Sequence, residues 1–324
     1  MIITKTPFRV SLCGGGSDLP AFYEKHGGCV ISTTINKYMY IASHPAFNKK
    51  NIVLKYSKTE NVVDSNEIEH EIFRECIKQE EIDGIEITSI ADIPQGTGLG
   101  SSSAFTVGLI KNLKCYKREF ISDEEVAQIA CDMEINVLNN PIGKQDQYAA
   151  AYGGLNYYQF NKDGSVFVEP VMMTKEALNK LENNLVMLYV GGEHNASKIL
   201  KQQSKNITSG DKEIGQLRIC ELTKQLKYEL ENNNVDALGP ILHENWLIKK
   251  SLASGISNPQ FDEWYDLALK NGAEGGKLLG AGGSGFFLFY VPLEKQTGFL
   301  DAMKDLPAMD FKFDYQGTTA IFVN

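Results

Sequence analysis

A glycine- and serine-rich stretch at residues 92–110, "DIPQGTGLGSSSAFTVGLI", has the residue types of a phosphate-binding loop. Its glycines leave backbone N–H groups unshielded, and the helix expected from about Ser102 would add the partial positive charge of its N-terminus. The stretch lacks the lysine of a Walker P-loop, and it does not open a dinucleotide-binding unit. For this stretch alone, a tight turn capped by a serine is the alternative.

Three other stretches combine charged residues with glycines. "PFRVSLCGGGSDLP" places Arg9 on an expected strand and then runs through three glycines to Asp18. "MEINVLNNPIGKQDQYAAAYGG" places Glu134 on an expected helix and Asp146 in a polar segment, and "LLGAGGSGFFLF" is a second glycine loop. Each feature has a plainer interpretation, such as an exposed helix carboxylate for Glu134. Their occurrence together favours a phosphate ligand for the stretch at residues 92–110.

In this order, "TPFRVSLCGGGSDLP", "PQGTGLGSSSA" and "LLGAGGSGFF" resemble the three signatures of the GHMP kinase superfamily and spread over nearly the whole chain. Within it, "GSSSAFTVGL" and "GKQDQYAAAYGGLN" look like the bacterial D-glycero-D-manno-heptose 7-phosphate kinase group. In the second half of the chain, the resemblance to this group is limited to the third glycine motif and "NASKIL". The resemblance implies an α+β fold with a ribosomal protein S5 domain 2-like domain followed by a ferredoxin-like domain. The sequence places the boundary near residues 165–184, so we expect the domains at residues 1–175 and 176–324.

The resemblance also implies phosphoryl transfer from ATP with Mg²⁺, which requires a phosphate cradle, a cation and a group that places the attacking hydroxyl. Ser102 would bind Mg²⁺ with Glu134 as its carboxylate partner, since this ion takes a few protein oxygens and fills its other positions with water and phosphates. Asp146 would accept or orient the proton of the hydroxyl, and Arg9 would stabilise developing charge. The implied ATP loop comprises Pro94, Gly96, Thr97, Gly98, Leu99, Gly100, Ser101, Ser102 and Ser103.

The acceptor sugar is expected beside the first motif. Asp18 would accept hydrogen bonds from vicinal hydroxyls, while neighbouring glycines let a bulky sugar approach the backbone. Lys144 would share a face with Asp146 if that segment were extended. The third glycine loop would close over the substrates from the second domain. The implied acceptor-binding residues are Arg9, Gly15, Gly16, Ser17, Asp18, Lys144, Asp146, Gly282 and Gly283.

The activity that the resemblance implies is phosphorylation of the anomeric hydroxyl of heptose 7-phosphate, giving a 1,7-bisphosphate for nucleotide-activated heptose and surface polysaccharide. An L-fucose kinase or another anomeric sugar kinase is the alternative within the same chemistry. A catalytically inactive sugar or nucleotide sensor would show damage at the chemistry residues, which are intact here. A decarboxylase acting on a phosphorylated mevalonate is disfavoured by Asp18 and the sugar-like first motif.

Hydrophobic periodicity and turn residues predict the elements that must position these residues. A capping box, Ser122 with Glu125, marks one helix start, and an Asp64 or Ser65 cap marks another. Expected strands cover residues 2–12, 29–44, 84–94 and 183–192 and end the chain at 311–323. Expected helices cover residues 65–80, about 102–112, 122–138, 196–205, 210–231 and 235–251.

Composition bounds the remaining properties. The chain has 324 residues and a formal net charge of −9, which argues against a nucleic-acid partner. Its six cysteines show no metal-site spacing and are expected to be buried, reduced thiols. No apolar run is long enough to span a membrane, and a cytoplasmic location is expected. Small-molecule substrates are the expected partners, and a homodimer is left open.

Overall fold

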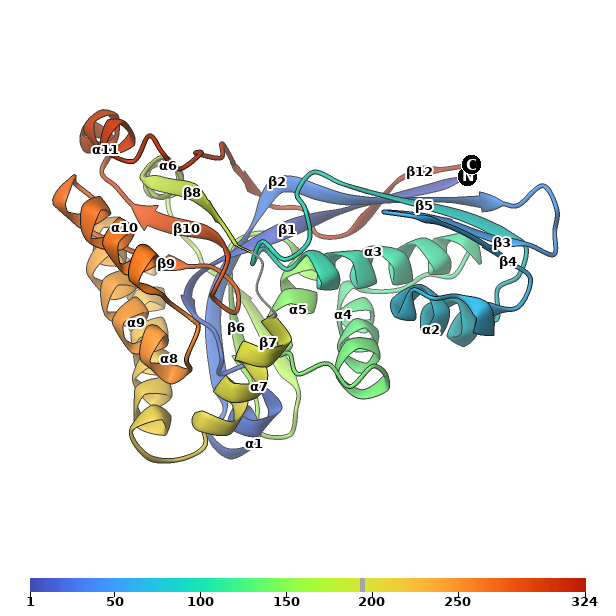
Figure 1. The fold of residues 1–324 in the computed structure, drawn as a ribbon, viewed down its shortest axis with the longest axis horizontal. Coiled ribbons are helices and arrows are strands. Elements are labelled where there is room, and N and C mark those ends of the chain that lie inside the picture. The colour runs from blue at the N-terminus through green and yellow to red at the C-terminus, as the bar shows by residue number, and fades with distance from the viewer. Residues whose placement is uncertain (193–195) are drawn as a thin grey trace.

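The computed structural model describes residues 1–192 and 196–324. Its larger sheet runs in the order β12-β1-β2-β5-β3-β4, with β6 and β11 also paired to β2 and β7 paired to β6 (Figure 1). The strands of this sheet are β1 (Ile2–Gly14), β2 (Gly28–Pro45), β3 (Ile52–Lys55), β4 (Thr59–Val62), β5 (Ile85–Ala91), β6 (Asn156–Phe160), β7 (Val166–Pro170), β11 (Phe313–Asp314) and β12 (Thr319–Val323).

Strand β1 is antiparallel to β2 along its whole length, and it carries the first candidate site residue. Residues in the first part of β1 alternate between buried and half-buried, whereas the second part is buried on both faces. Arg9 lies in this second part and is only 5% exposed. The strand then ends at Gly14, and Gly14, Gly15 and Gly16 all have positive φ angles that favour glycine. The chain therefore passes from the buried strand that carries Arg9 into a loop of glycines, whose backbone no side chain covers.

Helices α2 to α5 lie together on one side of the larger sheet (Figure 1). Helix α3 packs against β1 and β2, and α2, α4 and α5 pack against α3. The helix expected from about Ser102 is confirmed and begins at Ser101, directly after the glycine run. The expected capping box of Ser122 and Glu125 is also confirmed. The helices of this half are α1 (Pro20–His26), α2 (Glu71–Glu80), α3 (Ser101–Tyr116), α4 (Asp123–Cys131), the π-helix η2 (Asp132–Val137) and α5 (Gln145–Tyr152).

A second, smaller sheet has the antiparallel order β8-β10-β9, with α9 packed against β9 and β10. Helix α8 packs against α9 and also contacts β1 and β2 of the larger sheet. The strands are β8 (Leu185–Gly191), β9 (Gly275–Leu278) and β10 (Gly285–Tyr290). The helices are α6 (Lys175–Asn183), α7 (Ala196–Asn206), α8 (Gly210–Glu231), α9 (Leu238–Leu252), α10 (Pro259–Lys270) and α11 (Gln296–Ala302).

The end of the chain returns to the larger sheet. Strand β11 pairs with β2, and β12 pairs with β1, so that Val323 lies opposite Ile2 and the two termini are neighbours (Figure 1). The expected α+β fold is confirmed by this mixture of two sheets and packed helices. A boundary near residue 175 stays a prediction, and residues 313–323 belong to the first sheet although they follow the second.

One expected helix starts later than its sequence pattern suggested. Residues 65–80 were expected to form a single helix, but Asp64 caps only a short 3₁₀ turn, and α2 begins at Glu71. The reason is a competing hydrogen-bond acceptor, because the Glu60 carboxylate accepts from the backbone N–H groups of Glu69 and His70, at 2.6 and 3.2 Å. These N–H groups point to Glu60, so they mark the start of the helix rather than its interior.

The remaining sequence expectations concern thiols, histidine and membrane spans. All six cysteines are free, and five of them are buried as expected, whereas Cys115 is half-buried. Within the described residues, no helix combines the length and apolar character needed to cross a membrane. His194, which its sequence context predicts to be a packing or surface residue and not a catalytic one, lies outside the described residues.

Candidate active site

A cavity of about 460 Å³ lies where five segments meet. They are the first glycine loop (residues 14–16), the phosphate loop (residues 94–103), α7, α9 and the third glycine loop (residues 280–285). Most of the charged residues singled out in the sequence line it, although they come from elements far apart in the chain. The lining includes Arg9, Gly14, Gly15, Gly16, Asp18, Gly96, Gly98, Gly100, Ser101, Ser102, Ser103, Glu134, Asp146, Gln203, Lys249 and Gly280.

Arg9 and Asp146 form a two-point ion pair in this cavity. The Arg9 Nε donates to Asp146 Oδ1 at 2.8 Å, and Nη2 donates to Oδ2 at 2.9 Å. The third arm of the guanidinium, Nη1, donates to the Gly98 carbonyl at 2.7 Å. The backbone N–H of Arg9 also donates to the Leu99 carbonyl at 3.2 Å. Arg9 therefore fixes the Asp146 carboxylate and the phosphate loop relative to each other.

The phosphate loop enters α3 through Gly100, whose φ of +77° lies in the left-handed region. A β-carbon at Gly100 would lie 3.1 Å from Asp146 Oδ2 and 3.4 Å from Arg9 Cγ, so the ion pair rests against this glycine. Gly100 is also the residue that precedes the first turn of α3. The positive end of that helix therefore faces the same space as the Asp146 carboxylate, a position suited to a phosphate group.

The third glycine loop packs directly on the phosphate loop. A β-carbon at Gly98 would lie 2.6 Å from the Leu279 carbonyl oxygen, and one at Gly280 would lie 2.5 Å from Gly98 Cα. The Ser284 hydroxyl also donates to the Gly96 carbonyl at 3.1 Å. Only glycines allow backbones to approach this closely, so the two loops form one surface although about 180 residues separate them.

A buried carboxylate, Glu134, lies at the base of α3. Its Oε1 accepts from the Ser102 hydroxyl at 2.8 Å, and its Oε2 accepts from Gln147 Nε2 at 2.7 Å. Burial raises the pKa of Glu134 above its ordinary value, although hydrogen bonds from Ser103, Ser102 and Gln147 oppose that shift. No ion pair involves Glu134 within residues 1–192 and 196–324. A divalent cation beside Ser102 would supply the missing charge, so these hard oxygen donors fit Mg²⁺.

Asp18 lines the same cavity beside the first glycine loop. Its Oδ1 accepts from the Gly16 N–H at 2.9 Å, and its Oδ2 accepts from the Gln145 N–H at 3.3 Å. Burial, with a smaller contribution from the Asp146 charge, raises the pKa of Asp18 above its ordinary value. Two backbone donors thus hold this carboxylate at a set angle beside the glycine loop, where further acceptor capacity remains for a ligand hydroxyl.

The structure does not bring every expected site residue into the cavity. Pro94, Thr97, Leu99 and Ser17 are absent from its lining, and Thr97, Leu99 and Ser17 are buried behind it. Gly282 and Gly283 instead pack against the Ile256 backbone.

Lys144 also lies apart from the cavity. It adopts a helical conformation as the residue before α5, so the extended arrangement that would align it with Asp146 does not occur. Its ammonium donates to the Gly164 carbonyl and lies 4.9 Å from the ring centroid of Tyr23.

Two buried lysines and two glutamines of the second half were missed in the sequence. Lys249 lines the cavity, and Lys277 lies behind the first glycine loop with its Nζ donating to Ser11 Oγ at 3.2 Å. Gln203 and Gln216 crowd Gly16, since a β-carbon there would lie 2.4 Å from Gln203 Nε2 and 2.8 Å from Gln216 Oε1. The sequence held one signal, a lysine inside the apolar strand "GGKLL"; the other three residues have ordinary helical contexts.

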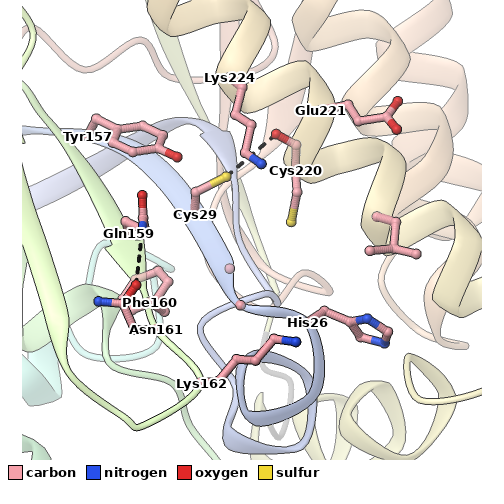
Figure 2. A pocket seen from close by; sticks show the side chains of 13 residues that line it. His26, Cys29, Tyr157, Gln159, Phe160, Asn161, Lys162, Cys220, Glu221 and Lys224 are labelled. Atoms are coloured by element: carbon pink, nitrogen blue, oxygen red, sulfur yellow. Dashed lines mark hydrogen bonds between the residues drawn. The ribbon is translucent and has the colours of Figure 1, made fainter.

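A second cavity, of about 470 Å³, lies between α1, β6 and α8 (Figure 2). Cys29 and Cys220 face it, and the Cys29 thiol donates to the Cys220 carbonyl at 3.5 Å. The Ser17 hydroxyl donates to the Cys29 carbonyl at 2.9 Å, so this cavity adjoins the back of the first glycine loop. Its lining includes neither a glycine-rich phosphate loop nor Arg9 or Asp146. We therefore take the first cavity as the candidate active site.

Two family models match the chain. The model of the N-terminal domain of GHMP kinases matches residues 67–154, and the model of the C-terminal part of GHMP kinases matches residues 226–303. These segments include the phosphate loop, Glu134 and Asp146 in the first match and the third glycine loop in the second. The matched segments thus hold much of the candidate site, whereas Arg9, the first glycine loop and Asp18 precede them.

Three similar proteins span different parts of the chain. A D-glycero-alpha-D-manno-heptose 7-phosphate kinase of Campylobacter jejuni is 28% identical over 98% of this chain and 97% of its own length. The bifunctional fucokinase/GDP-fucose pyrophosphorylase of Arabidopsis thaliana is 28% identical over 63% of this chain and 20% of its own length. The crystal structure of a D-glycero-D-manno-heptose 1-phosphate kinase of Bacteroides thetaiotaomicron, 25% identical, matches with a TM-score of 0.82 over all of both chains.

Proposed function

The chain belongs to the GHMP kinase family and is an ATP-dependent kinase, and we propose that it phosphorylates the anomeric hydroxyl of D-glycero-D-manno-heptose 7-phosphate. The product would be the 1,7-bisphosphate, an intermediate of nucleotide-activated heptose for surface polysaccharide. The reaction would take place in the cytoplasm, where ATP is supplied. The two heptose kinase relatives support a sugar acceptor, although their names place the phosphate at different positions.

The observation that carries the proposal is the convergence of Arg9, Asp18, Ser102, Glu134 and Asp146 on one cavity. Phosphoryl transfer depends on positioning and on the stabilisation of charge, so it needs these groups close together. An inactive sensor would be free to lose them. Their joint presence, with Arg9 and Asp146 paired at 2.8 and 2.9 Å, favours an active enzyme over a sensor.

Ser102 and Glu134 would hold Mg²⁺, which supplies charge neutralisation to the ATP phosphates when it is bound. The free backbone N–H groups at Gly96, Gly98 and the start of α3 would bind the phosphate oxygens. The Arg9 guanidinium lies on Gly98 and would add positive charge next to the same loop. These groups bind and orient ATP without contributing a covalent step.

Asp146 would orient the acceptor hydroxyl and take its proton as the oxygen attacks phosphorus. Both carboxylate oxygens already accept from Arg9, which prevents rotation of the carboxylate and keeps its remaining lone pairs in place. Asp18 would hold neighbouring hydroxyls of the sugar, since its position is set by the Gly16 and Gln145 N–H groups. The acceptor would therefore lie between Asp18 and Asp146, with its reacting oxygen toward the phosphate loop.

An L-fucose kinase is the second candidate, because the plant fucokinase shares 28% identity over 63% of this chain. The two activities differ in the acceptor alone. A coupled ATP-consumption assay with heptose 7-phosphate, L-fucose, galactose and mevalonate separates them. We expect turnover with heptose 7-phosphate and a new phosphorus signal from an anomeric phosphate in ³¹P NMR. Turnover with only an unphosphorylated sugar would exclude heptose 7-phosphate as the acceptor. Transfer to a hydroxyl other than the anomeric one would exclude the proposed position.

The role of Asp146 has its own test. We expect Asp146→Asn to retain ATP binding and to lower kcat by about 10²–10⁴-fold, the usual contribution of general base catalysis. Asparagine has the same shape and can still accept one hydrogen bond from Arg9, so the fold should survive. Lys144→Met serves as the control, because Lys144 lies nearby but outside the cavity. A kcat for Asp146→Asn within about threefold of the wild type would rule out the base role.

A further inference from the structure

Lys249 places a buried ammonium group in the wall of the candidate active site. It lies on α9, in the second half of the chain, and is 6% exposed. Its Nζ donates to the Leu278 carbonyl at 3.0 Å and to the Gly280 carbonyl at 2.6 Å. An ammonium has three N–H donors, so these two carbonyls leave one donor for the cavity that Lys249 lines.

The charges around Lys249 are mainly of its own sign. Burial, followed by the positive charges of Lys277 and Arg9, lowers the pKa of Lys249 well below its ordinary value, and only Asp18 opposes this. No carboxylate forms an ion pair with Lys249 within residues 1–192 and 196–324. A buried cation without a counter-ion is unfavourable in the free protein. An anion in the cavity would remove that cost.

The neighbouring Lys250 shows what an ordinary lysine on the same helix does. Its Nζ lies 3.1 Å from the Asp262 carboxylate on α10 and is partly exposed to solvent. Lys249, one residue earlier, lies about 100° around the same helix and meets two carbonyls instead of a carboxylate. The burial of Lys249 therefore reflects its place in the site rather than a general feature of α9.

The position of Lys249 relates it to phosphate chemistry. The Gly280 carbonyl that it binds belongs to the glycine that packs on Gly98 of the phosphate loop. Arg9, which donates to the Gly98 carbonyl from the other side, is already neutralised by Asp146. Lys249 is thus a cation at the junction of the two loops whose charge no protein carboxylate balances.

We propose that Lys249 binds a phosphate oxygen of a ligand in this cavity, and this inference rests on the proposed kinase function. Two phosphates could supply that oxygen, the one already present on the acceptor sugar and the one transferred from ATP. The contact would also tie the ligand to the third glycine loop through the Leu278 and Gly280 carbonyls. A phosphate-bearing ligand would then hold the second half of the chain against the phosphate loop.

The test compares Lys249→Met and Lys249→Arg with Lys250→Met as the control for loss of a lysine from α9. Steady-state KM and kcat are measured with ATP, heptose 7-phosphate and unphosphorylated heptose, and the affinities for a non-hydrolysable ATP analogue and for heptose 7-phosphate are measured by calorimetry. Loss of one charge-assisted hydrogen bond predicts a roughly 10- to 100-fold effect for Lys249→Met. Lys249→Arg should restore part of it, and Lys250→Met should match the wild type.

The pattern identifies the phosphate. If Lys249 binds the acceptor's phosphate, Lys249→Met weakens the binding of heptose 7-phosphate. The affinity for ATP and the kinetics with unphosphorylated heptose then stay unchanged. If it binds the transferred phosphate, ATP affinity or kcat falls equally with both acceptors. Equal behaviour of Lys249→Met and Lys250→Met, or a uniform loss that Lys249→Arg does not relieve, would overturn the proposal. Failure of the wild type to phosphorylate any sugar would reject the proposed function instead, and the two calorimetric affinities would still test Lys249.

Discussion

Lys277 offers a prediction whose size follows from the structure. It is fully buried on β9, where its Nζ donates to Ser11 Oγ at 3.2 Å and to the Gly14 carbonyl at 3.4 Å. Burial, with a smaller contribution from the Arg9 charge, lowers the pKa of Lys277 to about 8, although Cys13 opposes the shift. The folded state therefore loses this proton near pH 8, whereas the unfolded chain keeps an ordinary lysine that titrates near pH 10.4.

The sign and size follow from linkage between protonation and folding. Between about pH 8 and about pH 10.4 the unfolded chain binds more protons than the folded one, so this residue makes the free energy of unfolding rise with pH. Below about pH 8 both states are protonated, and the full cost of about 3 kcal/mol is present. From about pH 7.5 to about pH 9.5, the wild type should gain about 2 kcal/mol relative to Lys277→Met.

Urea unfolding of both proteins at several pH values in that range measures the difference directly. Comparing the two proteins removes contributions that they share, such as those of the buried tyrosines. Lys295→Met is the control, because the Glu274 carboxylate raises the pKa of that exposed lysine and keeps it protonated throughout the range. A difference between wild type and Lys277→Met that stays constant within about 0.5 kcal/mol would refute the reasoning.

Three further substitutions test separate parts of the fold. Gly98→Ala would bring a methyl group to 2.6 Å from the Leu279 carbonyl oxygen, whereas at Gly96 it would meet nothing within 4 Å. We therefore expect kcat/KM to fall much further for Gly98→Ala, and equal losses would contradict the packing of the two loops. Ser122→Ala removes the capping box and should lower the free energy of unfolding by about 1 kcal/mol in urea titrations. Trp246→Ala empties a fully buried site and should cost about 3–5 kcal/mol in the same assay, and a loss below about 1 kcal/mol would contradict its core position.

Local signals predicted the elements that carry the site. The start of α3 after the glycine run and the capping box at Ser122 depend on neighbouring residues, so the sequence pattern suffices for them. Helix α10 has local signals of the same kind, because Asn258 caps it and Pro259 occupies its first position. These are ordinary start signals. The residues at the start of α10 therefore suffice to predict where it begins.

Tertiary contacts were beyond the sequence pattern. Glu60 delays α2 by accepting from backbone groups nine and ten residues away, and no local rule identifies it as that acceptor. Lys249 and Lys250 are adjacent residues of the same type, yet Lys249 is buried and Lys250 pairs with Asp262. Which of them faces the site depends on how α9 packs against β9 and β10. The family resemblance supplied roles for Arg9 and Asp146, but not the two-point geometry that joins them.

The loop contacts carry a consequence for how the two halves of the chain cooperate. Glycines at 98 and 280 permit backbone contact that any side chain would block, and the Lys249 ammonium binds the Gly280 carbonyl from behind. The phosphate loop is therefore shaped from both sides, by Arg9 in the first half and by the third glycine loop in the second. A change that shifts α9 should alter ATP binding without touching the phosphate loop itself. We therefore expect the second half of the chain to contribute to the proposed nucleotide site, because its glycine loop packs directly on the phosphate loop.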